Sequence, residues 1–331
     1  MPGVVGLDIG TSTIKLSRRA GSGGIVTERV APTPSAPIEI MRVVDRLLRD
    51  APPGVVGLSA FRRALVVDDR TLVLARSSPP EPVVRVETGG RLDVLNPLAP
   101  IHRWADSVRL RSGRFQTFDV WLAERLTGRP ACAESLAWLT GAWDTTAGSW
   151  DERVCAEARI PPGQLPDVLT EPLVTGGICL PVLGDHEATA RACASAGAWP
   201  LRVAECGTAL ACMIGGGPEA PPRLGLESPV RCGYAELVDP HFARRVQGLD
   251  APPLAWSAAA SPSPGEVVAG AFGEDETSGA PIVLCGGNAT PGLAADLTAA
   301  GFDVLMDGTL TSSAGALIIA ERAAQAGGSR P

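Results

Sequence analysis

The residues best suited to chemistry near the start of the sequence are Asp8, the turn residues Gly10, Thr11 and Ser12, and Lys15. A loop that holds phosphate needs glycine for close backbone approach, N–H and hydroxyl donors, and a cation to balance charge. A metal-bound triphosphate also needs a nearby carboxylate, because Mg²⁺ prefers oxygen ligands and keeps several waters. The segment therefore predicts a phosphate-binding turn in which Asp8 holds Mg²⁺ through water. An ordinary tight hairpin explains the same residues equally well.

Lys15 is the only lysine among the 29 basic residues, all the others being arginine. Coding bias explains a general excess of arginine, but it does not explain why the exception lies beside this turn. We therefore favour retention of Lys15 for function. The sequence contains neither the G-x-x-x-x-G-K-[ST] loop nor the Rossmann fingerprint, which excludes those two modes of nucleotide binding.

Asp185 is the candidate catalytic base. Phosphoryl transfer to a hydroxyl requires a group that accepts the hydroxyl proton. Asp185 follows an apolar segment, 176–182, that has the composition of a buried strand, and the end of such a strand is where α/β folds place chemistry. The alternative is that Asp185 caps the predicted helix 187–196, a role compatible with catalysis. His186 is assigned no role.

A short echo of the first hairpin occurs later in the sequence. The segment Asp8-Ile9-Gly10-Thr11-Ser12 is followed much later by Glu205-Cys206-Gly207-Thr208-Ala209, with Gly-Thr at the same place in each. Two lobes built on one plan would turn both hairpins toward one nucleotide, so Gly207 and Thr208 are predicted phosphate contacts. Echoes of five residues also arise by chance.

A third glycine turn, Gly286-Gly287-Asn288, follows the predicted strand 281–284. Paired glycines let a purine or ribose lie against the backbone, and Asn288 could add a polar contact. Such pairs are also common where strands end, so the turn is a weak indication by itself.

Apolar spacing predicts the elements that must hold these residues in place. We expect strands at 4–8, 13–17, 54–59, 176–182, 201–205, 210–214 and 281–284, and helices at 38–49, 104–126, 132–139, 187–196 and 293–300. The order predicts an α/β protein of two lobes, residues 1–198 and 199–331, each a sheet flanked by helices. The tail should be disordered from about residue 325.

The bulk composition narrows the function class. A chain of 331 residues with 45% apolar residues can bury two cores, and a net charge of −7 argues against nucleic acid as a partner. No apolar run approaches the ~20 residues of a membrane span, so we expect a cytoplasmic protein without membrane contact. The eight cysteines include no C-x-x-C pair, which indicates buried free thiols. The three histidines are widely spaced, so no zinc site is expected.

Several segments together resemble the FGGY carbohydrate kinases. The matches in order are 7–15, Gly57-Leu58-Ser59 with 64–69, the helix 118–128 ending in Arg-Leu-Thr-Gly, the linker 158–166, Leu183-Gly184-Asp185, Cys206-Gly207-Thr208, and Gly286-Gly287 with Gly315-Ala316. The resemblance implies an actin-like ATPase (ribonuclease H-like) fold with a cleft between two lobes. It also implies ATP and Mg²⁺ as cofactors, and phosphorylation of a sugar, polyol or cyclitol. Family members are usually longer, so the second lobe is expected to be shortened between Ile214 and Pro281.

The resemblance also points to the acceptor site. It implies acceptor contacts from Ser59, Phe61, Arg62, Arg63 and Asp185. Phe61 and Arg63 stand where related kinases often carry Gln and His. Because guanidinium groups pair well with planar anions, the two arginines suggest an acceptor that bears a carboxylate or phosphate, unless they face solvent or pair internally. The chain is expected to be a monomer or a homodimer.

Two other functions remain open from the sequence. One is an activator-type ATPase of the same superfold, whose motif is similar to residues 8–15, although cluster-binding cysteine spacing is not apparent. The other is a sugar or nucleotide sensor without catalysis, suggested by the shortened second lobe.

Overall fold

The computed structural model describes most of both ends of the chain and parts of its middle. The described residues are 3–50, 54–61, 64–68, 70–74, 116–138, 140, 142–144, 147–157, 159–196, 201–206, 210–215, 230–231, 265, 268–269, 272, 279–287 and 289–327.

Among the described residues, a six-stranded mixed sheet forms the first half of the structure. Its order is β11 (Leu173–Thr175), β12 (Ile178–Gly184), β4 (Gly54–Ala60), β1 (Gly3–Ile9), β2 (Thr13–Arg19) and β3 (Ile25–Pro32). β1 pairs antiparallel with β2 and parallel with β4, and β12 runs parallel to β4. The hairpin predicted at the start of the chain is therefore confirmed.

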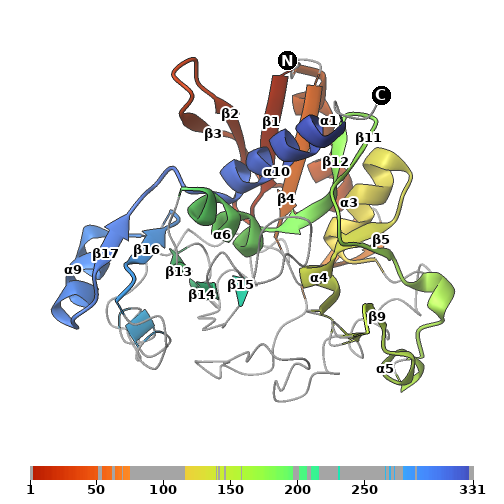
Figure 1. Ribbon diagram of the computed structural model, residues 1–331. Coiled ribbons are helices and arrows are strands. Elements are labelled where there is room, and N and C mark those ends of the chain that lie inside the picture. Colours follow the sequence, from red (N-terminus) through yellow and green to blue (C-terminus); the bar gives the residue numbers. More distant parts are fainter. Residues whose placement is uncertain are drawn as a thin grey trace.

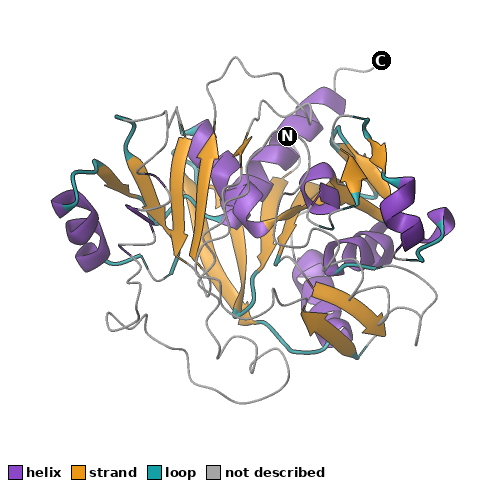
Figure 2. Cartoon of the chain, turned by 90° about the horizontal axis from the view of Figure 1, so that it is seen from below, coloured by secondary structure: helices purple, strands orange, loops and turns teal. Residues whose placement is uncertain are grey.

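A second mixed sheet repeats this plan in the described part of the chain. Its order is β15 (Val230–Arg231), β14 (Leu210–Gly215), β13 (Leu201–Cys206), β16 (Ile282–Cys285) and β17 (Val304–Met306). β13 pairs antiparallel with β14 and parallel with β16, and β17 runs parallel to β16. Taken in the order β17, β16, β13, β14 and β15, these strands have the same relative directions as β12, β4, β1, β2 and β3 of the first sheet. The echo in the sequence therefore marks a repeated sheet plan. Figure 2 shows the strands of the sheets in orange.

Helices and short hairpins complete the described structure. The helices are α1 (Pro37–Asp50), α3 (Phe118–Thr127), α4 (Glu134–Trp138), α5 (Glu152–Glu157), the 3-10 turn Pro162–Gln164, α6 (Asp185–Ser195), α9 (Pro291–Ala299) and α10 (Ser312–Gly327). The short strand pairs are β7 (Ala131–Ala133) with β10 (Asp167–Leu169), β5 (Ala64–Asp68) with β6 (Thr71–Leu74), and β8 (Trp143–Asp144) with β9 (Ser149–Trp150).

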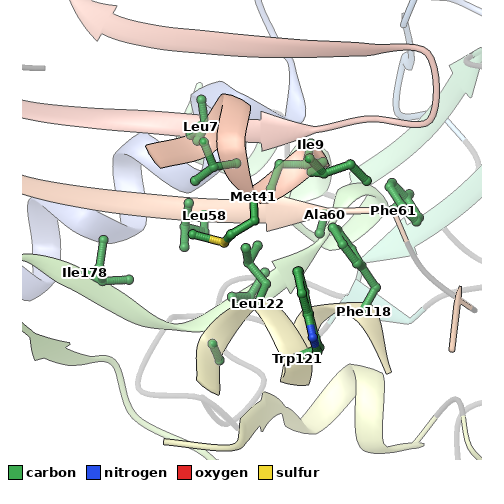
Figure 3. Close-up of a cluster of buried hydrophobic side chains, with 14 of the residues drawn as sticks. Leu7, Ile9, Met41, Leu58, Ala60, Phe61, Phe118, Trp121, Leu122 and Ile178 are labelled. Carbon is green, nitrogen blue, oxygen red and sulfur yellow. The ribbon is translucent and has the colours of Figure 1, made fainter. Parts of the chain in front are cut away.

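The largest apolar cluster packs α1 and α3 against the first sheet. Alternate residues of the parallel strands point to one face, which brings Leu7 of β1 and Leu58 of β4 together with Met41 of α1. Phe118 and Trp121 of α3 close the cluster with stacked rings 5.9 Å apart (Figure 3). These apolar faces are the spacing signal that predicted α1 and β4.

α6 and α10 cross between the two sheets. α6 follows β12 of the first sheet, and it packs against β13 of the second; α10 follows β17 of the second sheet, and it packs against β1 and β4 of the first. The two helices also pack against each other where they cross (Figure 1). The last helix of the predicted second lobe therefore covers the sheet of the predicted first lobe.

Glycines allow α10 to lie in backbone contact with its neighbours. A Cβ atom on Gly57 of β4 would lie 1.9 Å from the carbonyl oxygen of Ala316, and one on Gly6 of β1 would lie 2.0 Å from that of Ser313. In the same way, a Cβ on Gly315 of α10 would lie 1.7 Å from the carbonyl oxygen of Ala188 in α6. Because real Cβ atoms do not approach backbone so closely, side chains at these positions would force the helices apart.

Three boundaries differ from the sequence expectations. Segment 132–139, predicted to be helical, begins with the buried strand β7, whose small side chains allow it to pair with β10, and becomes helical only at Glu134. The strand predicted at 176–182 and the helix predicted at 187–196 follow each other directly, because β12 continues to Gly184 and α6 begins at Asp185. α10 continues to Gly327, past the residue near 325 where disorder was expected. Strands β3 and β17 and helix α10 were not predicted.

The described residues also bear on two compositional expectations. Six cysteines, Cys132, Cys155, Cys179, Cys193, Cys206 and Cys285, are buried and free, as expected. No helix in the described ranges is long and apolar enough to cross a membrane.

Gly57→Ala should destabilise the protein by about 1–3 kcal/mol, because its methyl group would collide with the backbone of α10. Thermal unfolding of the purified protein measures the effect. Gly163→Ala is the matched control, since a Cβ there meets nothing within 4 Å. Equal melting temperatures for both variants would contradict the close packing of α10 on β4.

Candidate functional site

The turn between β1 and β2 is tight and held by the end of β3. Gly10 N donates to Thr13 O at 3.1 Å, and a Cβ on Gly10 would lie only 2.9 Å from that oxygen. The Thr33 hydroxyl donates to Gly10 O at 2.6 Å, and Thr33 N donates to Ser12 O at 3.1 Å. The turn that was predicted to bind phosphate is thus preformed by backbone contacts that a side chain at Gly10 would disturb.

Asp8 lies buried near the end of β1, with one partner from each neighbouring strand. Its register partners are Lys15 of β2 and Ser59 of β4. Ser59 Oγ donates to Asp8 Oδ1 at 2.8 Å, and Lys15 Nζ lies 3.6 Å from Asp8 Oδ2. Burial, against the opposing effect of Lys15 and with a smaller contribution from Asp185, raises the pKa of Asp8 to about 6. Ser59, predicted to contact the acceptor, is directed at Asp8.

Asp185 is the first residue of α6 and comes directly after β12. The helix N-cap is Gly184, so the alternative that Asp185 is the cap is wrong. Its Oδ1 accepts from His186 N at 2.9 Å, and its side chain is 22% exposed. A carboxylate at a helix N-terminus is stabilised by the helix dipole. Asp185 therefore combines a fixed position with access to solvent or a ligand.

A buried ion pair anchors the first turns of α6. Arg191 Nε donates to Glu187 Oε1 at 2.9 Å, and the Ser135 hydroxyl of α4 donates to the other oxygen of Glu187. Both charged residues of this pair are buried. Because a buried pair with good geometry holds both partners, it fixes the helix that carries Asp185.

Glu205 of β13 is a functional candidate that we did not predict. Burial, together with the nearby Asp185 and Asp8 and against the opposing effect of Lys15, raises the pKa of its carboxyl to about 8. These electrostatic effects place Asp8, Lys15, Asp185 and Glu205 in one group drawn from both sheets. Glu205 occupies the place of Asp8 in the echo of the first hairpin, and this position is the sequence signal that could have identified it.

The charged group fits Mg²⁺ held through water. Three carboxylates supply hard oxygen atoms, and Glu205 Oε2 is buried without a hydrogen-bond partner in the described structure. Among the described residues, no three His, Cys, Asp or Glu side chains lie close enough together to hold a metal ion directly. Water-mediated contact, as expected for Asp8, is therefore the mode that suits this group.

The other predicted site residues divide into those that the structure describes and those that it does not. Gly286 directly follows β16 and has a φ of 97°. A Cβ on Gly286 would lie 2.4 Å from Cys206 O, so this turn lies against the end of β13. Gly287 is exposed. Phe61 is buried, its ring stacked 4.6 Å from that of Phe118 (Figure 3). Outside the described residues lie Arg62, Arg63, Gly207, Thr208 and Asn288, as do most positions of the expected shortening between Ile214 and Pro281.

Comparison with solved structures identifies the fold. A xylulose kinase from Lactobacillus acidophilus matches with a TM-score of 0.65 and 13% identity, over 98% of this chain and 89% of the kinase chain. A gluconate kinase from the same organism matches with a TM-score of 0.62 and 12% identity, over 97% of this chain and 89% of the kinase chain. A xylulose kinase from Rhodospirillum rubrum matches with a TM-score of 0.61 and 17% identity, over 97% of this chain and 90% of the kinase chain. No protein-family model and no curated protein sequence matches the chain.

The chain therefore has the two-lobed actin-like ATPase fold of carbohydrate kinases, with mixed sheets flanked by helices. This confirms the predicted fold class, and it confirms the resemblance to the FGGY carbohydrate kinases at the level of the fold.

Glu205→Gln should become progressively more stable than the original protein as pH rises. The folded state holds the Glu205 proton more tightly than the unfolded chain, so this contribution to stability is complete below about pH 4.5 and is lost as pH rises through about 8. Gln has no such proton to lose. One pKa unit is worth about 1.4 kcal/mol, so the advantage should grow by at least ~1 kcal/mol between about pH 5 and 9.

Thermal unfolding in the presence of a metal chelator measures this trend. Glu28→Gln, which removes an exposed carboxylate, is the control. A stability difference between Glu205→Gln and the original protein that does not change with pH would show that Glu205 is not a buried, proton-holding carboxyl.

Proposed function

We propose that this protein transfers the γ-phosphoryl group of ATP to a hydroxyl of a small sugar, polyol or cyclitol. The observation that carries the proposal is the placement of Asp185, a partly exposed carboxylate, within electrostatic reach of Asp8 beside the preformed Gly10 turn. The proposed base and the proposed phosphate turn follow strands of the same sheet, β12 and β1, which are separated by β4. The carbohydrate-kinase fold supports this assignment.

Each residue would have a distinct task in the reaction. Asp185 accepts the proton of the attacking hydroxyl, and the rigid start of α6 keeps it in line with the phosphate. Lys15 and the turn at Gly10, Thr11 and Ser12 bind the phosphates, joined by Gly207 and Thr208 of the second hairpin; Gly286, Gly287 and Asn288 would take the adenosine. When bound, Mg²⁺ would neutralise phosphate charge, with Asp8 directing it through water. Catalysis then comes mainly from positioning and electrostatics.

The acceptor itself is proposed to carry a negative charge. β4 ends at Ala60, and Phe61, Arg62 and Arg63 are the next residues in the sequence. Two guanidinium groups at this place would favour a carboxylate or phosphate on the acceptor. Turnover of neutral sugars but of no sugar acid would contradict this part of the proposal.

Asp185→Asn should abolish phosphorylation while leaving ADP binding intact. The amide keeps the size and position of the side chain but cannot accept a proton, so kcat should fall by about 10²–10⁴-fold. The assay is ADP release from Mg-ATP with a panel of sugars, polyols, cyclitols and sugar acids. Nucleotide binding without turnover on any acceptor would favour a sensor over a kinase.

Lys15→Arg should lower kcat/KM for ATP by about tenfold, a loss of ~1.4 kcal/mol in transition-state stabilisation. Arginine keeps the charge but replaces a compact ammonium with a larger planar group that cannot occupy the same place beside Asp8. Arg18→Lys, an exposed exchange on the same strand, is the control and should have no effect. Unchanged kinetics in Lys15→Arg would mean that the single lysine has no specific role.

A further inference from the structure

We propose that Glu205 is a second metal-directing carboxylate, which holds Mg²⁺ at the nucleotide phosphates from the second sheet as Asp8 does from the first. The inference rests on the proposed function, because it concerns the same nucleotide site. It adds a residue that the resemblance to known kinases does not supply.

The repeated sheet plan places Glu205 at the position of Asp8. Asp8 lies two residues before Gly10 on the strand that pairs antiparallel with β2 and parallel with β4. Glu205 lies two residues before Gly207 on the strand that pairs antiparallel with β14 and parallel with β16. Each carboxylate therefore lies near the end of the equivalent strand, just before the Gly-Thr of its hairpin.

The neighbours of the two carboxylates differ in a way that leaves Glu205 available. Asp8 has Lys15 and Ser59 as its register partners, and both interact with it. The register partners of Glu205 are Ala211 of β14 and Cys285 of β16. Neither can balance the charge of a carboxylate, so the protein supplies Asp8 with internal partners but does not supply Glu205 in the same way.

One carboxylate oxygen of Glu205 has no hydrogen-bond partner among the described residues. The hydroxyl of Thr189 in α6 hydrogen-bonds to the carboxyl group, and Thr189 Oγ1 itself lies 3.1 Å from Ser312 Oγ of α10. Glu205 Oε2 is buried and makes no hydrogen bond within the described structure. A buried carboxylate oxygen without a partner costs free energy, and such a group is found where an ion or bound water completes the site.

The charges around Glu205 indicate that the missing partner is a cation. Asp8 and Asp185 are its acidic neighbours, and Lys15 is its basic one. An ionised Glu205 next to nucleotide phosphates would repel them unless a cation lay between the two, and a divalent cation with bound waters reverses the sign of that interaction. The competing explanation is that Glu205 stays protonated and donates a hydrogen bond to a phosphate.

Glu205→Gln separates these explanations, because Gln keeps a hydrogen-bond donor and the size of Glu but has no negative charge with which to attract a cation. The measurement is the dissociation constant of ADP by titration calorimetry, in chelator and in saturating Mg²⁺, for the full-length protein. The ratio of the two constants is the affinity gained from metal. In Glu205→Gln this gain should fall by about 10-fold or more, as happens when residues that orient metal ligands are lost.

Two variants accompany the test. Glu205→Asp retains the carboxylate and should retain part of the metal-linked gain. Asp119→Asn removes a different fully buried carboxylate that also has an oxygen without a partner, and it should leave the gain unchanged. Competition of Mg²⁺ with bound Mn²⁺, followed by electron paramagnetic resonance in the presence of ADP, provides a second readout of metal affinity.

The outcomes decide between this inference and the proposed function. A full metal-linked gain in Glu205→Gln would overturn the inference in favour of the protonated donor. An equal loss of ADP affinity with and without metal would also overturn it. Glu205 would then contribute to nucleotide binding directly, or by holding the turn between β13 and β14, and not through a metal ion. If the gain falls as expected but the original protein phosphorylates no acceptor, Glu205 directs metal and the kinase proposal fails alone.

Discussion

The contact on which the rest of the site depends is the backbone packing of α10 against the first sheet and against α6. Gly6 and Gly57 bring the helix down onto β1 and β4, and Gly315 brings it onto α6. α6 in turn packs its small side chains against Val203 and Val283 of the second sheet. The crossing therefore links both sheets to the helix that begins with Asp185, so the distances among the charged residues follow from how closely two helices can approach.

Buried and partly buried hydroxyl groups complete this crossing where apolar packing stops. Four of them form a ring of hydrogen bonds at 2.6–3.3 Å, namely Ser17, Thr27, Thr311 and Ser313. Thr189 of α6 makes a separate hydrogen bond with Ser312 of α10 at 3.1 Å. Side chains that hydrogen-bond to one another satisfy their polar atoms without water and accept fewer alternative arrangements than apolar ones. Thr189 also hydrogen-bonds to Glu205, so the separate pair links α10 and α6 to the carboxylate of the second sheet.

Local patterns in the sequence were sufficient for the first hairpin, α1, β4 and the place of Asp185, because apolar periodicity and turn residues determine these elements directly. They were insufficient for α10, whose start is a run of Ser, Gly and Ala that shows no apolar stripe; its position depends on glycines more than 250 residues earlier in the sequence. The same limit applied to Ser59, whose register beside Asp8 and hydrogen bond to it could not be seen in the sequence. Glu205 could have been found from the echo, but its unpaired oxygen could be seen only in three dimensions.

The placement of acids in both sheets has a consequence for how the two halves respond to ligand. Asp8 and Asp185 come from the first sheet and its following helix, whereas Glu205 comes from the second. Asp185 raises the pKa of both Asp8 and Glu205, and Asp8 also raises that of Glu205. Like charges on the two sheets repel when ionised, and a divalent cation between them converts repulsion into attraction. Metal and nucleotide binding would then favour a closer approach of the sheets, and by thermodynamic reciprocity any change that brings the sheets together would strengthen metal binding. The repeated plan thus places beside the first carboxylate a lysine and a serine that interact with it, and beside the second an alanine and a cysteine.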